Sequence, residues 1–432
     1  MDRPFVPLAA TVSNAMTKHR AVTSNNPKPL AHYTEATVAG GLTFLAGQLA
    51  SDFKTGVPKE ARKDPSFPFY GSDIKLQTRF ILNNIKNTLQ AAGSSFEHVV
   101  KAQVFLTDLN DFAAFDEVWR EFFAVPPPRT TVGTSGLLVK DTLIEIDLIS
   151  ALPESGGLVA ISSANPKPLA AYTEATRAGD LVFAAGQLAS DFKTGVPKEA
   201  RKDPNFPFYG SDIKLQTRFV MEHLKATFAA AGTTLDHVVK SQVFLTDLDN
   251  FAAFDEVWRE YFKVPPPRTT VGVTGLLIKD SLIEIDLIAY VPGGATRHEV
   301  VADTGNPRPL ANYSEAVTVG DFVFAAGQLA TDFKTGVPKE ARKDPNFPFY
   351  GSDIKLQTKY IMESLKRTLA AAGSSLEQVI KAQVFLMDLN DFAGFDEVWR
   401  QYFAVPPPRT TIGTTGLLIK DALIEIDVIG VR

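Results

Sequence analysis

The chain has 432 residues, of which 45% are hydrophobic and 22% are charged, as is typical of soluble globular proteins. It contains no cysteine, which excludes disulfides, thiolate nucleophiles and cysteine-ligated metals. The net charge of −5 comes without a long basic run, and no apolar run reaches the roughly 18 residues of a membrane span, so we expect neither nucleic acid nor a membrane as a partner.

The N-terminal stretch MDRPFVPLAATVSNAMTKHR does not resemble a secretory signal. It has an acidic residue at position 2, two prolines and no sustained apolar segment. We therefore expect a cytoplasmic protein, and the absence of cysteine is compatible with a reducing compartment.

A long internal repeat dominates the sequence. The block AGQLASDFKTGVPKEARKDP at 46–65 returns at 185–204 and, with one Ser→Thr change, at 326–345. A period of about 140 residues is long enough for an independent hydrophobic core. We predict three domains at 27–150, 166–290 and 307–432, an N-terminal extension at 1–26, and linkers at 151–165 and 291–306. One reason for three copies is that the domain works only as a trimer.

The first half of one copy predicts a strand and then a helix. The apolar run 41–50 has the length of a buried strand and ends at a turn around Gly56. Apolar residues then recur at helical spacing, Ser72 or Asp73 can cap the helix start, and Gly93 stands where the helix should stop.

The second half of the copy predicts a strand, a helix and a hairpin. Residues 99–108 alternate as in a half-buried strand, and Asn110 or Asp111 can cap a second helix striped with aromatic residues. Two β-rich segments, 129–139 and 142–150, should meet in a hairpin at Lys140 and Asp141. The order β-β-α-β-α-β-β predicts an α+β fold with both helices on one face of a mixed sheet.

The opposite face of this sheet has two interpretations. In 143–149, Ile144, Ile146 and Leu148 alternate with Leu143, Glu145 and Asp147. The acidic face is either exposed to solvent or turned toward another copy in a closed three-domain arrangement around a central barrel. The triplication favours the second alternative.

The absence of a shared histidine and of a glycine-rich phosphate loop excludes several kinds of active site. No histidine recurs in all three copies, since His32, for example, becomes Ala171 and Asn312. This excludes Ser-His-Asp triads and histidine metal sites as shared features, and no phosphate-binding glycine loop is present. We therefore predict no metal and no cofactor.

An arginine follows three prolines in every copy, at Arg129, Arg268 and Arg409. The prolines stiffen the chain that leads into a strand, and arginine binds carboxylates through two parallel hydrogen bonds. The arginine therefore either grips a carboxylate ligand, pairs with Glu145, Asp147 or Asp116, or is a surface charge.

Three weaker candidates also recur in each copy. A mid-strand glutamate can orient water or form a structural salt bridge. A tyrosine can present its hydroxyl or simply pack, and a glycine can admit a ligand or mark a bulge. These residues are Glu145, Glu284 and Glu425; Tyr33, Tyr172 and Tyr313; and Gly47, Gly186 and Gly327.

Taken together, the motifs resemble those of the Rid (YjgF-type) family of reactive intermediate deaminases. They are YTEA, AGQ, LxxAG, VVKxxVFLTDLxDFxxF, PxRTTV and IEIDLI, in this order in nearly the same form in each copy. The resemblance implies a chorismate-mutase-like fold that assembles as a trimer, with a central β-barrel, helices outside and sites between subunits. This chain is then a fused pseudo-trimer that acts as a monomer.

The same resemblance implies a reaction. The arginine would bind the substrate carboxylate, the glycine backbone and the tyrosine would meet the ligand, and the glutamate would orient water. An enamine or imine such as 2-aminoacrylate would be hydrolysed to a 2-oxo acid and ammonia without a cofactor. The alternatives are a larger, aminomuconate-like C–N substrate, a non-catalytic binding protein, and a ribonuclease, which the acidic charge disfavours.

Three features depart from the family. Thr131, Thr270 and Thr411 stand where the family often has cysteine, and Asp116, Asp255 and Asp396 replace an amide, which would repel a carboxylate unless the arginine neutralises it. An aromatic insertion of roughly ten residues precedes the first helix. Its aromatic residues either wall a larger pocket or staple the loop to the helix; they are Phe67, Phe69, Tyr70, Phe206, Phe208, Tyr209, Phe347, Phe349 and Tyr350.

Overall fold

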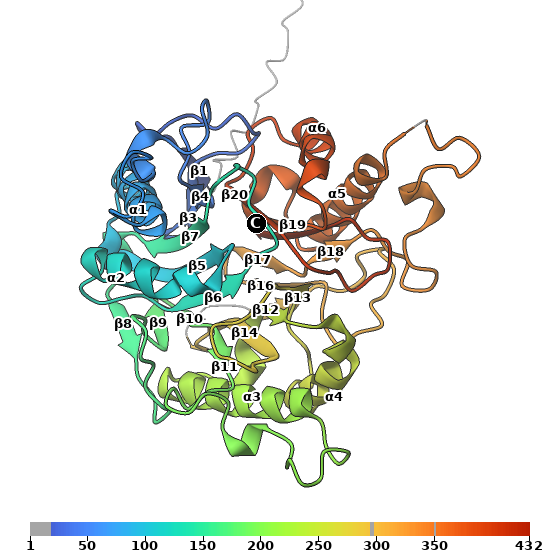
Figure 1. Ribbon diagram of the computed structural model, residues 1–432. Helices are drawn as coiled ribbons and strands as arrows, with labels where there is room; N and C mark the ends of the chain where they lie inside the picture. The colour runs from blue at the N-terminus through green and yellow to red at the C-terminus, as the bar shows by residue number, and fades with distance from the viewer. Residues whose placement is uncertain (1–18, 294–297, 350) are drawn as a thin grey trace, which may run out of the picture.

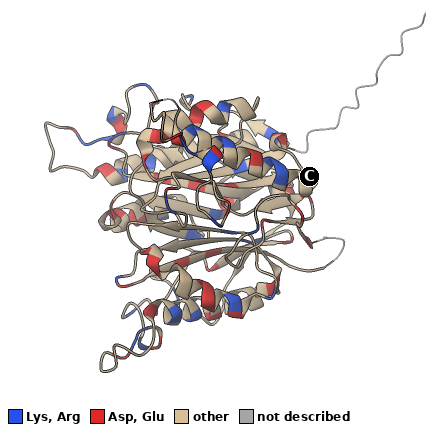
Figure 2. Cartoon of the chain, turned by 90° about the vertical axis from the view of Figure 1, so that its right-hand side faces the viewer, with Lys and Arg blue, Asp and Glu red and all other residues tan. Residues whose placement is uncertain are grey.

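The computed structural model describes residues 19–293, 298–349 and 351–432. Its three repeats surround a common centre, with the strands inside and the helices outside (Figure 1). Charged residues of both signs are frequent on the outer helices and loops (Figure 2). The predicted fold class, three repeated α+β units with mixed sheets, is confirmed.

Each repeat has the same succession of elements. The first consists of β1 His19–Val22, β2 Ala36–Ala39, β3 Leu42–Leu45, β4 Gln48–Leu49, α1 Asp73–Ala92, β5 Val99–Leu106, α2 Phe112–Phe122, β6 Arg129–Gly133 and β7 Ile144–Ala151. The second consists of β8 Leu158–Ile161, β9 Ala175–Ala178, β10 Leu181–Ala184, β11 Gln187–Leu188, α3 Asp212–Ala230, β12 Val238–Leu245, α4 Phe251–Tyr261, β13 Arg268–Gly272 and β14 Ile283–Tyr290. The third consists of β15 His298–Val300, β16 Ala316–Val319, β17 Phe322–Ala325, β18 Gln328–Leu329, α5 Asp353–Ala371, β19 Val379–Leu386, α6 Phe392–Tyr402, β20 Arg409–Gly413 and β21 Ile424–Val431.

The strand order of the first sheet is β1-β2-β3-β7-β5-β6, and β4 also pairs with β7. β5 and β6 run parallel, whereas β7 runs antiparallel to β5. The predicted hairpin at Lys140 and Asp141 is therefore wrong, because β5 separates its two strands. The connecting segment pairs with other repeats instead, through a bridge between Leu137 and Ile412.

The first predicted helix is confirmed as α1. It begins after Ser72 and ends at Gly93, whose φ of 87° is in the left-handed region that glycine tolerates. The second helix differs at its start. The carboxylate of Asp108, rather than a side chain at 110 or 111, caps a short 3₁₀ turn that leads into α2 by accepting a hydrogen bond from the Asn110 N–H.

Two strand predictions need correction. The strand expected over 41–50 is interrupted between β3 and β4, at Ala46 and Gly47. The strand expected to be half-buried is buried along all of β5, because its second face contacts the other repeats. β7 is buried in the same way, and Glu145 is only 2% exposed. The interpretation in which the acidic face is exposed to solvent is thus wrong.

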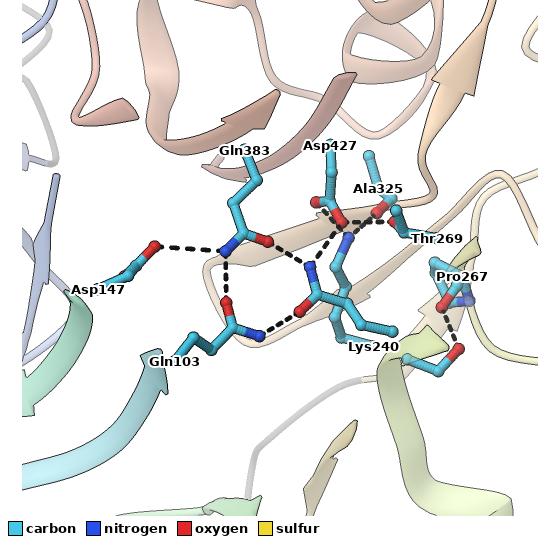
Figure 3. A network of polar contacts seen from close by, with 10 residues as sticks. Gln103, Asp147, Lys240, Pro267, Thr269, Ala325, Gln383 and Asp427 are labelled. Atoms are coloured by element: carbon cyan, nitrogen blue, oxygen red, sulfur yellow. Dashed lines mark hydrogen bonds and ion pairs between the residues drawn. The ribbon is translucent and has the colours of Figure 1, made fainter. Parts of the chain in front are cut away.

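The centre combines an apolar layer with a polar network. Phe44, Val100 and Ile149 join their counterparts in one buried cluster. Beside it, Gln103, Gln242 and Gln383 form a ring of hydrogen bonds (Figure 3). Around the ring, each buried lysine pairs with an aspartate of the next repeat, and the third repeat is followed by the first: Lys101 with Asp286, Lys240 with Asp427 and Lys381 with Asp147.

The sheets of neighbouring repeats are joined by isolated bridges, such as the one between Val132 and Leu276. Closure of these sheets into a barrel stays a prediction. The segments that we assigned as the extension and the linkers contain β1, β8 and β15, each of which adds an edge strand to the repeat that follows it.

Candidate active site

Three cavities lie at the seams between repeats. The first seam, between repeats 1 and 2, holds a cavity of about 300 Å³. The second seam, between repeats 2 and 3, holds one of about 650 Å³, and the third, between repeats 3 and 1, one of about 350 Å³. These volumes fall in or near the range of small-molecule sites, which is about 300 to 1,000 Å³.

Each seam brings together predicted residues from two repeats. One repeat supplies the arginine and the threonine, and the next supplies the tyrosine, the glycine and the glutamate. The first seam has Arg129, Thr131, Tyr172, Gly186 and Glu284; the second has Arg268, Thr270, Tyr313, Gly327 and Glu425; the third has Arg409, Thr411, Tyr33, Gly47 and Glu145. At each seam, the arginine of one repeat therefore shares a cavity with the glutamate of the next repeat and not with the glutamate of its own repeat.

The arginine stands at the start of a strand and is held on several sides. Arg129 opens β6, is 3% exposed and packs its guanidinium on the rings of Phe112, Phe115 and Trp119. Its Nη2 donates to Asp116 Oδ1 at 2.8 Å, while its buried Nη1 has no hydrogen-bond partner. The ion-pair alternative with Asp116 is thus observed, and a second nitrogen remains free for a ligand.

The aspartate is neutralised by its neighbours. Asp116 accepts from Arg129 and Arg120 and from the N–H of Ala171, which belongs to the next repeat. Asp255 and Asp396 form the equivalent pairs with Arg268 and Arg409. Of these predicted binding residues, only Asp255 lines its cavity. The repulsion that we considered for the aspartate is therefore offset by two arginines.

The glutamate of each seam is buried, and its pKa is raised. Burial, together with the charge of Asp147, raises the pKa of Glu145 from 4.5 to about 8, against the opposing effects of Lys381 and the Thr411 N–H. The pKa values of Glu284 and Glu425 are likewise about 8. Oε2 of each glutamate is buried without a hydrogen-bond partner. A carboxyl group with these properties can both donate and accept a proton near neutral pH.

The tyrosine and the threonine complete the cavity. Burial, followed by the charge of Glu145, raises the pKa of Tyr33 above its usual range, so its phenol stays protonated. The ring of Tyr33 lies 5.9 Å from the guanidinium carbon of Arg409. Thr411 contributes its backbone N–H to Glu145 across the seam. This threonine thus ties the acid of one repeat to the arginine strand of another.

The turn that the sequence predicted around Gly56 lines a cavity in every copy, a role that the sequence interpretation did not give it. Phe53 has a φ of 58°, and Lys54 follows it at the cavity wall. Asp52 holds this turn by accepting from the N–H groups of Lys54 and Thr55 and from the Thr55 hydroxyl. A signal was present, because SDFKTG or TDFKTG recurs in each copy.

The aromatic insertion takes neither predicted role. Phe69, Phe208 and Phe349 are about 95% exposed, and no aromatic residue of the insertion lines a seam cavity in the described part of the chain. The Phe67 N–H donates to the Asp64 carbonyl within the loop, and the Lys63 N–H donates to the Asp73 carboxylate at the start of α1. The loop projects from the body, as the equivalent loop before α5 in Figure 1 shows. Both alternatives for these residues are therefore wrong; Tyr350 lies outside the described residues.

Two further searches covered only the described residues. No group of three or more histidine, cysteine, aspartate or glutamate side chains is arranged to hold a metal ion. None of the helices there combines the length and hydrophobicity that crossing a membrane requires.

Comparison with known proteins identifies the family. The model of the endoribonuclease L-PSP family matches residues 23–152, 162–291 and 304–432. A RutC family protein of Pyrococcus horikoshii is 40% identical over 134 residues, covering 31% of this chain and 98% of that protein. RidA from the Antarctic bacterium Psychrobacter sp. is 31% identical, covering 31% and 99%, with a TM-score of 0.27. Escherichia coli TdcF, solved with bound serine, is 30% identical, covering 31% and 98%, also with a TM-score of 0.27. The chain therefore belongs to the endoribonuclease L-PSP family, which includes the Rid (YjgF-type) proteins, and carries three tandem copies of its domain.

Proposed function

We propose that each seam is a hydrolytic deaminase site for an enamine or imine that carries a carboxylate. The products are a 2-oxo acid and ammonia. One observation carries the proposal: in the first seam, Arg129 with a free Nη1 and Glu284 with a pKa of about 8 line the same cavity. In the other seams, Nη1 of Arg268 and Arg409 makes a long hydrogen bond of 3.4 Å to a backbone carbonyl, which a carboxylate would replace.

The arginine anchors the substrate in this proposal. A carboxylate on Nη1 of Arg129 would satisfy a buried donor that has no partner in the described chain. Packing against three aromatic rings and pairing with Asp116 fix the guanidinium plane. The carbon that bears nitrogen is then held next to the glutamate, and positioning of this kind supplies much of the rate.

The glutamate moves the protons. The protonated glutamate gives its proton to the enamine carbon, which yields the iminium ion. Water then adds to the iminium carbon and returns one proton to the glutamate, which leaves a neutral carbinolamine. The glutamate passes that proton to the nitrogen, ammonia leaves, and the hydroxyl proton returns to the glutamate as the C=O bond forms. With a pKa of about 8, Glu284 is mostly protonated at pH 7 and still accessible as a base.

Other activities fit the site less well. A larger, aminomuconate-like substrate would use the same groups and is favoured where the cavity is widest, at about 650 Å³ in the second seam. A non-catalytic binding protein would not need an acid with a shifted pKa. A ribonuclease, as the family's name suggests, is disfavoured by the net charge of −5.

Ammonia release from freshly generated 2-aminoacrylate tests the proposal. The wild-type chain should accelerate this release. The triple variant Arg129→Ala/Arg268→Ala/Arg409→Ala should lose the activity, because no arginine then binds the substrate carboxylate. Full activity in that variant would contradict the arginine's role. A wild-type chain that binds 2-oxo acids but releases no ammonia would favour the binding-protein alternative.

A further inference from the structure

The outer side of the first repeat holds a cavity that belongs to no seam. Its volume is about 600 Å³, which is within the range of small-molecule sites. Four apolar residues, Leu89, Phe96, Phe122 and Phe123, and two charged residues, Lys86 and Glu97, are among those that line it. The rings of Phe96 and Phe123 meet edge to face, with 4.9 Å between their centroids. We call this cavity the flank groove.

The flank groove arises because the two helices of the repeat differ in length. The helices α1 and α2 run in parallel, as two ion pairs four residues apart show: Lys75 with Glu117 and Arg79 with Glu121. The shorter helix α2 ends at Phe122, whereas α1 continues to Ala92. A space is therefore left beside the last turns of α1, and Val125 at its edge is 69% exposed.

The first repeat lacks a contact that the other two repeats make at this place. In the second repeat, the Tyr261 hydroxyl donates to Glu222 Oε1 at 2.9 Å, and the third repeat has the equivalent bond at 2.8 Å. The first repeat has Phe122 and Asn83 at these positions. Phe122 instead meets Phe96 edge to face at 5.6 Å, and the other repeats have leucine in place of Phe96. The aromatic lining is thus particular to the first repeat.

The sequence that precedes β1 contains a segment suited to an aromatic groove. Residues 4–8 read PFVPL, so that Pro4 and Pro7 have the spacing PxxP. Such segments favour the polyproline II helix, whose three residues per turn place both prolines on one face, and they bind grooves lined by aromatic residues. The preceding Asp-Arg pair carries charges opposite to those of Lys86 and Glu97 at the groove.

The described chain begins close to the flank groove. Arg20 in β1 donates from Nη2 to the carbonyl of Ala92, at the C-terminal end of α1, at 3.2 Å. Residues 1–18 lie outside the described residues. The stretch 9–18, between PFVPL and β1, spans up to roughly 33 Å when extended, whereas a helix is only about 10 to 12 Å across. The segment is therefore long enough to reach the groove from either side of α1.

We propose that residues 4–8 dock into the flank groove of the first repeat of their own chain, as a polyproline II segment packed on Phe96, Phe122 and Phe123. Docking there covers the exposed side chain of Val125, which three prolines connect to Arg129 of the first seam. This interaction surface lies outside the seam cavities, and it does not depend on the proposed function.

Disulfide trapping tests the inference on the full chain, which has no cysteine of its own. Leu8→Cys is combined either with Gln90→Cys, at the groove, or with Ala91→Cys, at the next residue of α1, which is also exposed but does not line the groove. A segment without a preferred place should close both pairs at similar rates. We expect mild oxidation at low protein concentration to close the first pair about ten-fold faster, because docking raises the effective concentration at the groove.

Two further variants, each added to the first pair, locate the effect. Pro4→Ala/Pro7→Ala removes the PxxP spacing. Asn83→Glu/Phe96→Leu/Phe122→Tyr gives the groove the residues of the second repeat, which that repeat accommodates. Each should slow trapping to the rate of the second pair.

Three results would overturn the inference. The first is equal trapping rates for the two original pairs. The second is trapping that either further variant leaves unchanged. The third is disulfides that join two chains, seen as dimers on a non-reducing gel, since these would assign the groove to a second copy.

Discussion

Oε1 of Glu145 lies 1.9 Å from the position that a Cβ atom on Gly47 would occupy. The same relationship holds at 2.0 Å between Glu284 and Gly186 and at 2.0 Å between Glu425 and Gly327. No side chain fits there without displacing the carboxyl group. The glycine is thus needed for the position of the acid, which was not one of the two roles that we considered for it from the sequence.

A methyl group at this position should disable the sites. In Gly47→Ala/Gly186→Ala/Gly327→Ala, we expect ammonia release to fall by about 100-fold, because a displacement of about 1 Å at the reacting groups has this effect. The far-ultraviolet circular dichroism should be unchanged. Gly157→Ala is the control, since nothing lies within 4 Å of its Cβ position. Wild-type activity in the triple variant would show that the acid has no role in the reaction.

The raised pKa of the three glutamates predicts a pH-dependent stability. Their folded-state pKa of about 8 exceeds the usual 4.5, so the folded chain binds more protons between these values. Unfolding free energy should therefore decrease as pH rises from 5 to 8, by up to about 1.4 kcal/mol per pH unit and carboxyl.

Glu145→Gln/Glu284→Gln/Glu425→Gln should remove this decrease. Urea unfolding at several pH values measures it, and Glu60→Gln/Glu199→Gln/Glu340→Gln, in which exposed glutamates are changed, serves as the control. If the wild-type and the buried-site variant follow parallel curves from pH 5 to 9, the glutamates titrate normally.

The aspartate that pairs with the arginine should limit carboxylate affinity. In Asp116→Asn/Asp255→Asn/Asp396→Asn, the arginine is no longer neutralised, so we expect KM to fall several-fold. Stability should decrease by about 1 to 3 kcal/mol per site, as for lost hydrogen bonds to a charged group. Steady-state kinetics and urea unfolding measure the two effects. A higher KM would mean that the aspartate mainly orients the arginine.

The buried pair of Lys101 and Asp286 joins repeats 1 and 2 at 2.6 Å. Lys101→Met leaves the aspartate buried without its partner and should cost about 3 to 5 kcal/mol. The double variant Lys101→Met/Asp286→Leu should recover much of that loss, because no unpaired charge remains. Urea unfolding of both variants tests this. Equal destabilisation of the two would show that shape, and not charge, governs the centre.

Local patterns predicted the local structure well. The apolar spacing and Gly93 identified α1, since both signals lie within the helix itself. The supposed hairpin failed because β6 pairs with β5, a strand that precedes it by more than twenty residues, and no local signal marks that pairing. The burial of β5 and β7 depends on contacts with other repeats, which periodicity within one copy does not show.

The site was predictable in its residue types but not in its pairings. The family resemblance named the arginine, tyrosine, glycine and glutamate, and all line the seam cavities. The turn around Gly56 was predicted, but its place in the cavity wall was not, because that place depends on the fold. The aromatic insertion was misjudged since hydrophobic residues usually pack, whereas Phe69 is 95% exposed.

The central claim is that each site is shared by two repeats, and two double variants test it most directly. Arg129→Ala/Glu284→Gln places both changes in the first seam, whereas Arg129→Ala/Glu145→Gln places them in one repeat but two seams. For three similar sites, ammonia release should keep about two-thirds of wild-type activity in the first variant and about one-third in the second. The reverse order, or equal activities, would contradict the account.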